Sequence, residues 1–187
     1  MRLTSLRLYT GRLLIVVGLV VVAWASIKLA HATSVWNEYG RTPPAIADLE
    51  EIAGPLEPGT ALGVIEIPRL QLASVILEGE DASTLLAGVG HVSGTPLPWQ
   101  DSNSVLAGHR DTFFRDLKHV RSGDTVRVVT RDKTLEYIVR DVQIVDPSDL
   151  HALEPTVQPT LTLITCYPFT YIGPAPRRYV VRAERVI

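Results

Sequence analysis

The chain has 187 residues, a net charge of −2 at neutral pH and a single cysteine. This length permits one modest domain after any targeting segment, and the nearly balanced charge gives no reason to expect a nucleic-acid partner. One cysteine excludes an internal disulfide, so the thiol of Cys166 is sealed in a core, paired with another molecule, or reactive.

The N-terminal segment predicts a membrane anchor. Residues 1–12 contain three arginines and no acidic residue, and the apolar run at 13–30 carries Lys28 as its only charge. That run is at the short end of the roughly 17 to 25 residues that cross a bilayer as a helix, and the arginines favour a cytoplasmic N-terminus. We therefore expect a single-pass protein of the cell membrane whose remaining residues lie outside the cytoplasm.

A cleaved signal peptide is the alternative for this segment. Ala30-His31-Ala32 has the small-x-small form of a cleavage site. The apolar run is long for a signal-peptide core, which usually has about 7 to 15 residues, and this favours a retained anchor. Either interpretation exports the rest of the chain.

The remainder divides into a stalk at 31–59 and a β-rich domain at 60–187. The stalk includes a possible short helix at 45–52 and ends in a linker rich in Pro and Gly. In the domain, the expected strands are 62–67, 73–77, 103–107, 124–130, 134–145, 160–166 and 178–186, and the expected helical pieces are 82–87 and 147–153. Strands dominate and lack the regular crossover helices of a parallel sheet, so we expect a mainly β fold, a closed or nearly closed antiparallel barrel.

The strand that ends at the cysteine indicates that the thiol is reactive. With a period of two, Leu161, Leu163 and Thr165 point one way, and Cys166 points the other way with Ile164. We expect the two leucines to face the core, so Cys166 lies on the opposite face of the strand, which has both polar and apolar residues. A cysteine kept for packing would more naturally share the leucine face.

A nucleophilic thiol needs a base or a cation beside it, because the thiolate is the reactive species. His109 follows the short apolar strand 103–107 and a glycine, which places it at a rim of the barrel. His91 is its rival among the five histidines. Taken alone, either residue could be a hydrogen-bonded structural histidine.

Two adjacent arginines follow the cysteine. In the last strand, Tyr179, Val181 and Ala183 suit the core, which puts Arg178 on the opposite face and Arg177 in phase with Tyr179 or in the loop. An arginine beside a thiolate stabilises it and can donate to a developing oxyanion. The strand pattern favours Arg178 for this role, although an arginine on a polar strand face is usually only solvated.

At these positions the sequence resembles the sortases, membrane-anchored cysteine transpeptidases of bacterial surfaces. Residues 162–166 match their TLxTC motif, Gly108-His109 matches the position of their catalytic histidine, and Arg178 matches their catalytic arginine. The segments GHRDTFF, TCYPF and APRRYVVRA look most like class D sortases. The resemblance implies an eight-stranded sortase barrel, and hence one further short strand near 90–92.

The resemblance also implies a mechanism. Cys166 would attack a carbonyl within an LPxTG-like C-terminal sorting signal of a secreted protein and form a thioacyl enzyme. An amine, from a cell-wall precursor or a pilin lysine, would then take the acyl group. His109 would move the protons, Arg178 would hold the substrate and the oxyanion, and Thr165 would contact the substrate.

Arg110 and Asp111 match the class D pattern, but we expect them to be structural or to support the catalytic residues before acting in the chemistry themselves. No cofactor and no metal site is predicted. Asp146, Asp149 and Glu154 precede the cysteine strand, but they match no calcium loop and suit a solvated surface. A zinc site made by Cys166, His91 and His109 lacks any paired ligand spacing.

Two other functions remain open from the sequence. A thiol peptidase that uses water as the acyl acceptor would need the same three residues, and added amine would then leave its products unchanged. A noncatalytic, membrane-tethered β-domain would have an inert thiol, which slow alkylation of Cys166 would reveal.

Overall fold

The computed structural model describes residues 17–23, 26, 56–171 and 173–186. The chain divides into two units, Met1–Val35 and Trp36–Ile187. In the first unit the described residues are helical, and Ser26 donates from its hydroxyl to the Val22 carbonyl. No helix in the described part of the chain is long and apolar enough to cross a membrane. The expected helix at 45–52 and most of the expected anchor and stalk lie outside the described residues.

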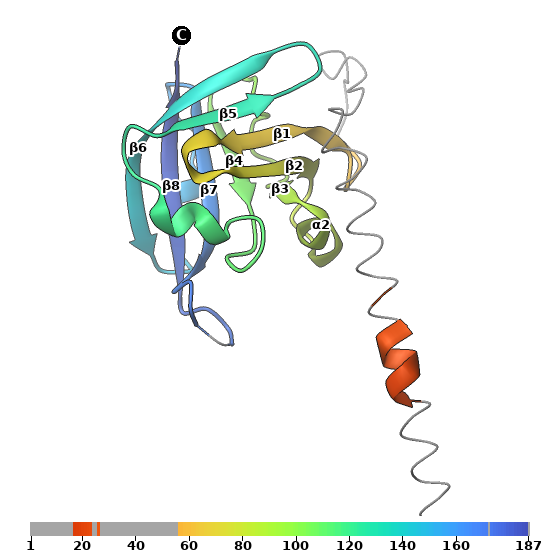
Figure 1. Ribbon diagram of the computed structural model, residues 1–187. Coiled ribbons are helices and arrows are strands. Elements are labelled where there is room, and N and C mark those ends of the chain that lie inside the picture. Colours follow the sequence, from red (N-terminus) through yellow and green to blue (C-terminus); the bar gives the residue numbers. More distant parts are fainter. Residues whose placement is uncertain (1–16, 24–25, 27–55, 172, 187) are drawn as a thin grey trace, which may run out of the picture. The chain divides into compact units, whose positions relative to one another are not determined.

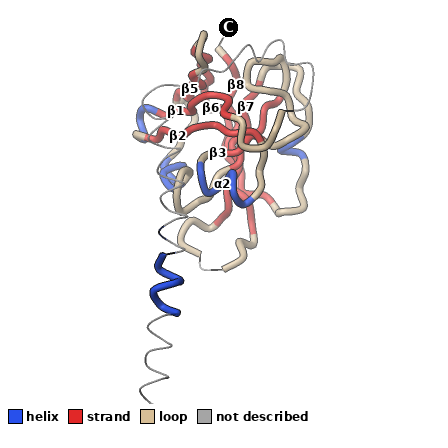
Figure 2. The backbone as a smooth tube through the Cα atoms, turned by 90° about the vertical axis from the view of Figure 1, so that its right-hand side faces the viewer, coloured by secondary structure: helices blue, strands red, loops and turns tan. Residues whose placement is uncertain are grey.

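The second unit is a closed β-barrel with few helices, as Figures 1 and 2 show. Its strands close in the order β1-β2-β3-β4-β7-β8-β6-β5. The strands are β1 (Ala61–Ile67), β2 (Leu72–Glu78), β3 (Val89–His91), β4 (Asn103–Ala107), β5 (Thr125–Val129), β6 (Thr134–Val145), β7 (Thr160–Tyr167) and β8 (Arg177–Arg185). The helices are α2 (Ala82–Ala87) and the 3-10 turns η1 (Pro68–Leu70), η2 (Arg115–His119) and η3 (His151–Leu153).

The prediction of a mainly β, closed, eight-stranded barrel is confirmed, and β3 is the additional short strand. The prediction of an antiparallel barrel is wrong at two places, because β2 pairs with β3 and β4 pairs with β7 in parallel. Helix α2 lies between these two strands in the chain, and β3 then runs in the same direction as β2 beside its last three residues. Asp81 begins this helix by accepting hydrogen bonds from the Ser83 and Thr84 amides.

The helical piece expected at 147–153 is reduced to the 3-10 turn η3. Asp146 accepts a hydrogen bond from the Ser148 amide at 3.0 Å, and Asp149 accepts one from the His151 amide at 3.0 Å. Such local bonds from Asp side chains offer the backbone an alternative to a helix. The connection from β6 to β7 is therefore a loop with one short turn.

The core lies inside the barrel, where alternate residues of each strand meet. On β7 the side chains of Leu161 and Leu163 are fully buried, as are Val181 and Ala183 on the neighbouring β8. Apolar burial of this kind stabilises the barrel by about 25 cal/mol per Å² of area removed from water. The core alternation therefore determines which β7 and β8 residues face outward.

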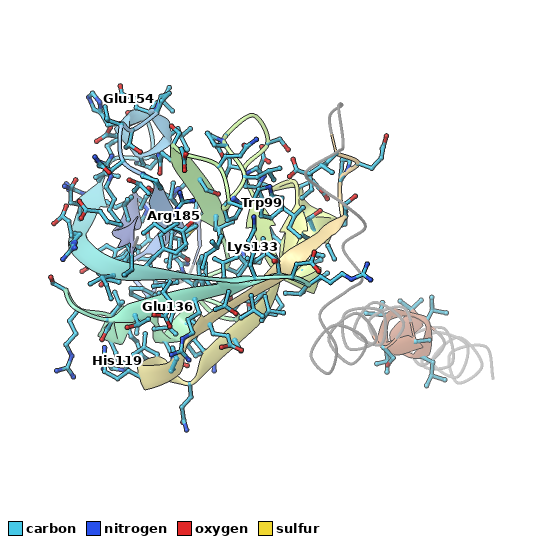
Figure 3. All side chains as sticks on the ribbon, turned by 90° about the horizontal axis from the view of Figure 1, so that it is seen from above. Trp99, His119, Lys133, Glu136, Glu154 and Arg185 are labelled. Atoms are coloured by element: carbon cyan, nitrogen blue, oxygen red, sulfur yellow. The ribbon has the colours of Figure 1, made fainter. Side chains whose placement is uncertain are left out.

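The connection from β3 to β4 lies at one end of the barrel, where its residues Leu97 and Trp99 pack against the core. Figure 3 looks onto this end and shows Arg185 beside Trp99. The Arg185 guanidinium donates to the Trp99 carbonyl at 3.4 Å, and the buried Tyr137 hydroxyl donates to the Pro98 carbonyl. The β7–β8 loop projects from the opposite end, the lower end in Figure 1.

Candidate active site

Cys166 lies one residue before the end of β7, on the outward face of the strand. It is half-buried, and its thiol is free. Among the described residues no hydrogen bond to this thiol is present. The side chain is therefore neither sealed in the core nor tied to a neighbour, as a nucleophile requires.

Arg178 lies directly opposite Cys166. The two are register partners in the antiparallel β7–β8 pair, so their side chains share the outward face. The Arg178 guanidinium makes only weak local bonds, to the carbonyls of Ala175 at 3.4 Å and Arg177 at 3.2 Å. Within the described ranges it has no acidic partner, so its charge remains available to the site.

Arg177 has a different environment. It pairs with Tyr167 in the register, so it belongs to the opposite face, and it is exposed. The pKa of Asp146 lies below its ordinary value because Ser148 donates to this carboxylate, and the positive charge of Arg177 contributes to the shift. Arg177 therefore lies on the other face of β8 from Arg178 and close enough to the solvated Asp146 to lower its pKa.

His109 approaches Cys166 from the other side of β7. Strand β4 runs parallel to β7 with Ala107 opposite Ile164, and the Gly108 amide extends the pairing by donating to the Ile164 carbonyl at 3.1 Å. Continuing this register by two residues from Ala107 sets His109 beside Cys166. His109 is half-buried, and its ring makes no hydrogen bond to any described residue.

The backbone around His109 is held on both sides. Thr165, which is 2% exposed, donates from its hydroxyl to the Gly108 carbonyl at 2.6 Å. The Phe114 amide donates to the His109 carbonyl at 3.0 Å. A Cβ atom at Gly108 would come within 2.7 Å of the buried Phe114 ring, so only glycine fits there. The contact of Thr165 with a substrate stays a prediction, whereas its bond to Gly108 holds the segment that carries His109.

Cys166 and Arg178, both expected from the sequence, are thus partners across β7 and β8, and His109 follows the end of β4 on the other side of β7. We call these three residues the reactive row.

His91, the rival histidine, is a structural residue. It is 2% exposed, and its Nδ1 lies 2.6 Å from a carboxylate oxygen of Glu78. Its Nε2 lies 3.1 Å from the Pro96 carbonyl and 3.1 Å from the Thr95 hydroxyl. Both ring nitrogens have partners within the fold and the ring is buried, which suits a structural role.

A second row of polar side chains crosses the same three strands and was not expected from the sequence. We call it the anchoring row: Asn103 on β4, Thr162 on β7 and Arg182 on β8. Thr162 donates to the Asn103 amide oxygen at 2.7 Å, and the Asn103 nitrogen donates to the carbonyls of Ala152 and Glu154. Arg182 donates to the His151 carbonyl at 2.7 Å. The β6–β7 loop is thereby fastened over the start of β7.

The acidic residues of this loop each have a separate partner. Asp146 and Asp149 cap local turns, and Glu154 pairs with His151 at 3.0 Å, which raises the pKa of that imidazole. Nowhere in the described ranges do three His, Cys, Asp or Glu side chains gather as a metal ion would require.

The reactive row suits acyl transfer through a thioester. A thiol on the open face can attack a carbonyl, an imidazole on one side can move protons, and a guanidinium on the other side can donate to the oxyanion. This chemistry is supported by the strand register, by the absence of described hydrogen bonds to the thiol and the imidazole, and by the weak local bonds of Arg178.

Comparison with known proteins agrees with this arrangement. The Sortase domain family matches residues 65–186. Sortase D of Bacillus subtilis is 39% identical over 133 residues, which cover 70% of this chain and 66% of that protein. A sortase of Streptomyces coelicolor is 31% identical over 134 residues, and the match spans only 38% of its length.

Solved structures give the same result. A Clostridium perfringens Sortase D5 transpeptidase superposes with a TM-score of 0.64 at 26% identity, covering 70% of this chain and 82% of that chain. Sortase C1 of Streptococcus agalactiae superposes with a TM-score of 0.64 at 32% identity, covering 68% of each chain. The barrel, the motif around Cys166 and these matches together show that the chain belongs to the sortase family, and within it is most like class D.

Proposed function

We propose that this chain is a membrane-anchored cysteine transpeptidase that cleaves an LPxTG-like C-terminal sorting signal and transfers the protein to an amine at the cell surface. The observation that carries the proposal is the register of the reactive row. Cys166 has Arg178 directly opposite on β8, and His109 follows the end of β4, the strand that pairs with β7 on its other side. A structural role alone would not require a free thiol, an imidazole without a described hydrogen bond and an arginine without an acidic partner in one row.

In the first half of the reaction, the thiol proton of Cys166 passes to His109, and the sulfur attacks a carbonyl carbon of the sorting signal. The oxygen that becomes negative accepts hydrogen bonds from the Arg178 guanidinium, whose charge persists at any physiological pH. The C–N bond then breaks, the leaving amine takes a proton from His109, and the acyl group stays on sulfur as a thioester.

In the second half, an acceptor amine attacks the thioester carbonyl. His109 now accepts the proton that the incoming amine gives up, and Arg178 stabilises the second oxyanion. The C–S bond breaks, a new amide forms, and the thiolate of Cys166 takes back a proton from His109, which restores the initial state. Water in place of the amine would release a free acid, which is the peptidase alternative.

The test is to incubate the full-length protein in detergent with a library of sorting-signal peptides and several amines, and to measure masses. We expect an adduct on Cys166 equal to the acylated peptide fragment, and a ligated product whose amount rises with amine concentration. Cys166→Ala should form no adduct. An adduct on the alanine variant would refute the mechanism, and free acid as the sole product at every amine concentration would favour the peptidase.

The anchor and the location are part of the same proposal. A spanning helix at 13–30 would hold the protein in the membrane by apolar burial, which salt does not screen. Full-length protein should therefore remain in the membrane fraction after a high-salt wash. Recovery of a soluble form that begins at Thr33 would instead show cleavage after Ala32.

A further inference from the structure

Arg110, the residue that follows His109, reaches across to the loop between β7 and β8. Its Nη2 donates to the Tyr171 carbonyl at 2.6 Å and to the Gly173 carbonyl at 3.3 Å. The guanidinium carbon also lies 5.9 Å from the centroid of the Tyr171 ring, within the range of a cation–π contact. One side chain thus makes three contacts with a segment about 60 residues away.

The loop that Arg110 holds joins two members of the reactive row. It leaves β7 directly after Cys166 and Tyr167 and enters β8 directly before Arg178. Among the described residues, the two bonds from Arg110 are the only hydrogen bonds that reach residues 168–176 from outside the β7–β8 hairpin. Packing of Phe169 on Tyr179, with centroids 5.1 Å apart, fixes the start of the loop but not its tip.

We propose that Arg110 is a positioning residue that couples the His109 segment to the β7–β8 loop, and so holds the histidine, the thiol and Arg178 in one geometry. The proposal rests on the function proposed above. It assigns Arg110 no contact with the substrate. Its effect on the reaction passes through the placement of the reactive row.

The chemistry of the side chain supports this role. A guanidinium is planar and can donate to two carbonyls while it stacks on a ring, whereas an ammonium is a compact point charge. The Arg110 Nη1 atom is buried without a hydrogen-bond partner among the described residues, so part of the group has been desolvated at a cost. This cost would not arise if Arg110 were merely solvated.

The two carbonyls that accept hydrogen bonds from Arg110 belong to exposed residues, which makes the proposed positioning role testable. Tyr171 is 46% exposed and Gly173 is exposed, so water can replace the guanidinium at both carbonyls. Removal of Arg110 should therefore loosen the loop more than it destabilises the barrel. Misplacement of catalytic groups by about 1 Å can lower a rate by about 10²-fold.

Arg115 supplies a matched control. It is an exposed arginine close to His109 in sequence, and it also donates to a backbone carbonyl, that of Asp111, at 2.6 and 3.0 Å. Its acceptor belongs to its own turn, so it holds nothing on the β7–β8 loop. Arg115→Ala removes the same charge without removing the link.

The experiment compares full-length wild-type protein with Arg110→Ala, Arg110→Lys and Arg115→Ala in detergent, by hydrogen exchange and by steady-state transpeptidation. In Arg110→Ala we expect faster amide exchange across 168–176 and a kcat lower by about 10- to 100-fold. Arg110→Lys should be intermediate in both measurements, and Arg115→Ala should match the wild type within about twofold.

The outcomes separate the inference from the proposed function. If Arg110→Ala exchanges no faster in the loop than Arg115→Ala, or exchanges faster without loss of kcat, the coupling is refuted. If Arg110→Ala does not fold, the test passes to Arg110→Lys. Wild-type amide exchange and wild-type kcat in Arg110→Lys would then overturn the proposal. If the wild type transfers no acyl group, the proposed function fails, and the exchange data alone decide whether Arg110 holds the loop.

Discussion

The reactive row and the anchoring row lie on the same outward face of β7 and β8. Only the anchoring row is covered by another segment, the β6–β7 loop. Thr162 and Arg182 are register partners, four residues along each strand from the partners Cys166 and Arg178. The anchoring row uses its hydrogen-bonding groups to hold the β6–β7 loop, and Thr162 is fully buried beneath it. In the reactive row the thiol and the imidazole have no described partner, and Arg178 has only weak local bonds.

Residue type alone does not distinguish a row that holds the structure from a row that takes part in a reaction. Both rows contain an arginine on β8 and a polar residue on or after β4. The difference is whether another segment of the chain supplies hydrogen-bond partners. A buried polar group must be paired, so the anchoring row contributes to stability, whereas the open row can be used in a reaction.

The largest effect should come from His109 in the reactive row. His109→Ala removes the proposed general acid and base, and should lower turnover by about 10²- to 10⁴-fold with little change in melting temperature. His91→Ala should do the reverse, because it leaves the buried Glu78 carboxylate with only the Ser93 hydroxyl as a donor while the reactive row stays intact. Steady-state rates and thermal melts of both variants test this, and the opposite ranking would move the catalytic role to His91.

The next largest effect should come from Arg178. Arg178→Ala removes the charged donor opposite the thiol and should lower the rate by about 10²- to 10³-fold. Arg178→Lys keeps the charge but loses the planar fork, so it should also be poor. Arg177→Ala is the matched control and should change turnover by about threefold at most, since a solvated surface charge contributes little. Near-normal activity of Arg178→Ala together with a severe loss in Arg177→Ala would contradict the register.

A smaller effect, on stability, is expected in the anchoring row. Asn103→Ala leaves the Ala152 and Glu154 carbonyls without their donor and the Thr162 hydroxyl without its acceptor. We expect the free energy of unfolding to fall by about 1–3 kcal/mol. Chemical denaturation measures this, and Ser148→Ala, in the same loop but outside the row, is the control. A loss of turnover as large as that of Arg178→Ala, without loss of stability, would show that the two rows do not differ as proposed.

The smallest effect should come from a pair outside both rows. Arg69 and the Arg121 amide donate to Asp124 and hold the pKa of its carboxyl below the ordinary value, with the hydrogen bond from Arg69 as the main cause. The folded state then binds fewer protons than the unfolded state. The stabilisation is present above the ordinary carboxyl pKa of about 4 and is lost as the pH falls toward the depressed folded pKa.

Asp124→Asn should remove this dependence and leave turnover of the folded protein unchanged. Unfolding free energies of the wild type and the variant, measured between pH 3 and pH 7 in steps of about one unit, should converge at the acid end. A constant difference across this range would mean that the ion pair is not the source of the effect.

Several features followed from the sequence because they depend on local pattern. The strand 103–107, the strand 134–145 and the helix 82–87 have the bounds predicted from the sequence pattern and its turn residues. The placement of Cys166 and Arg178 on one face also followed, since a period of two assigns faces within each strand regardless of its neighbours. The number of strands and the roles of the reactive row came from the resemblance to sortases.

Other features depend on which strands become neighbours, and local pattern does not contain that information. The parallel pairing of β4 with β7 sets the end of β4, which His109 follows, next to the end of β7 that carries Cys166. The long segment between these two strands does not reveal from its sequence that they become neighbours. The burial of Thr162 and the occupied state of His91 were likewise undetermined, because an outward polar residue is exposed unless a distant segment covers it.

The amino-acid sequence by itself thus determined the strand faces, the β-rich class and the residue types capable of thiol chemistry. The tertiary structure alone decided which histidine is free, which polar row is covered, and that Arg110 reaches the β7–β8 loop. The physical reason is that alternation and capping act over a few residues of chain, whereas burial and hydrogen-bond pairing depend on segments brought together from about 60 residues apart.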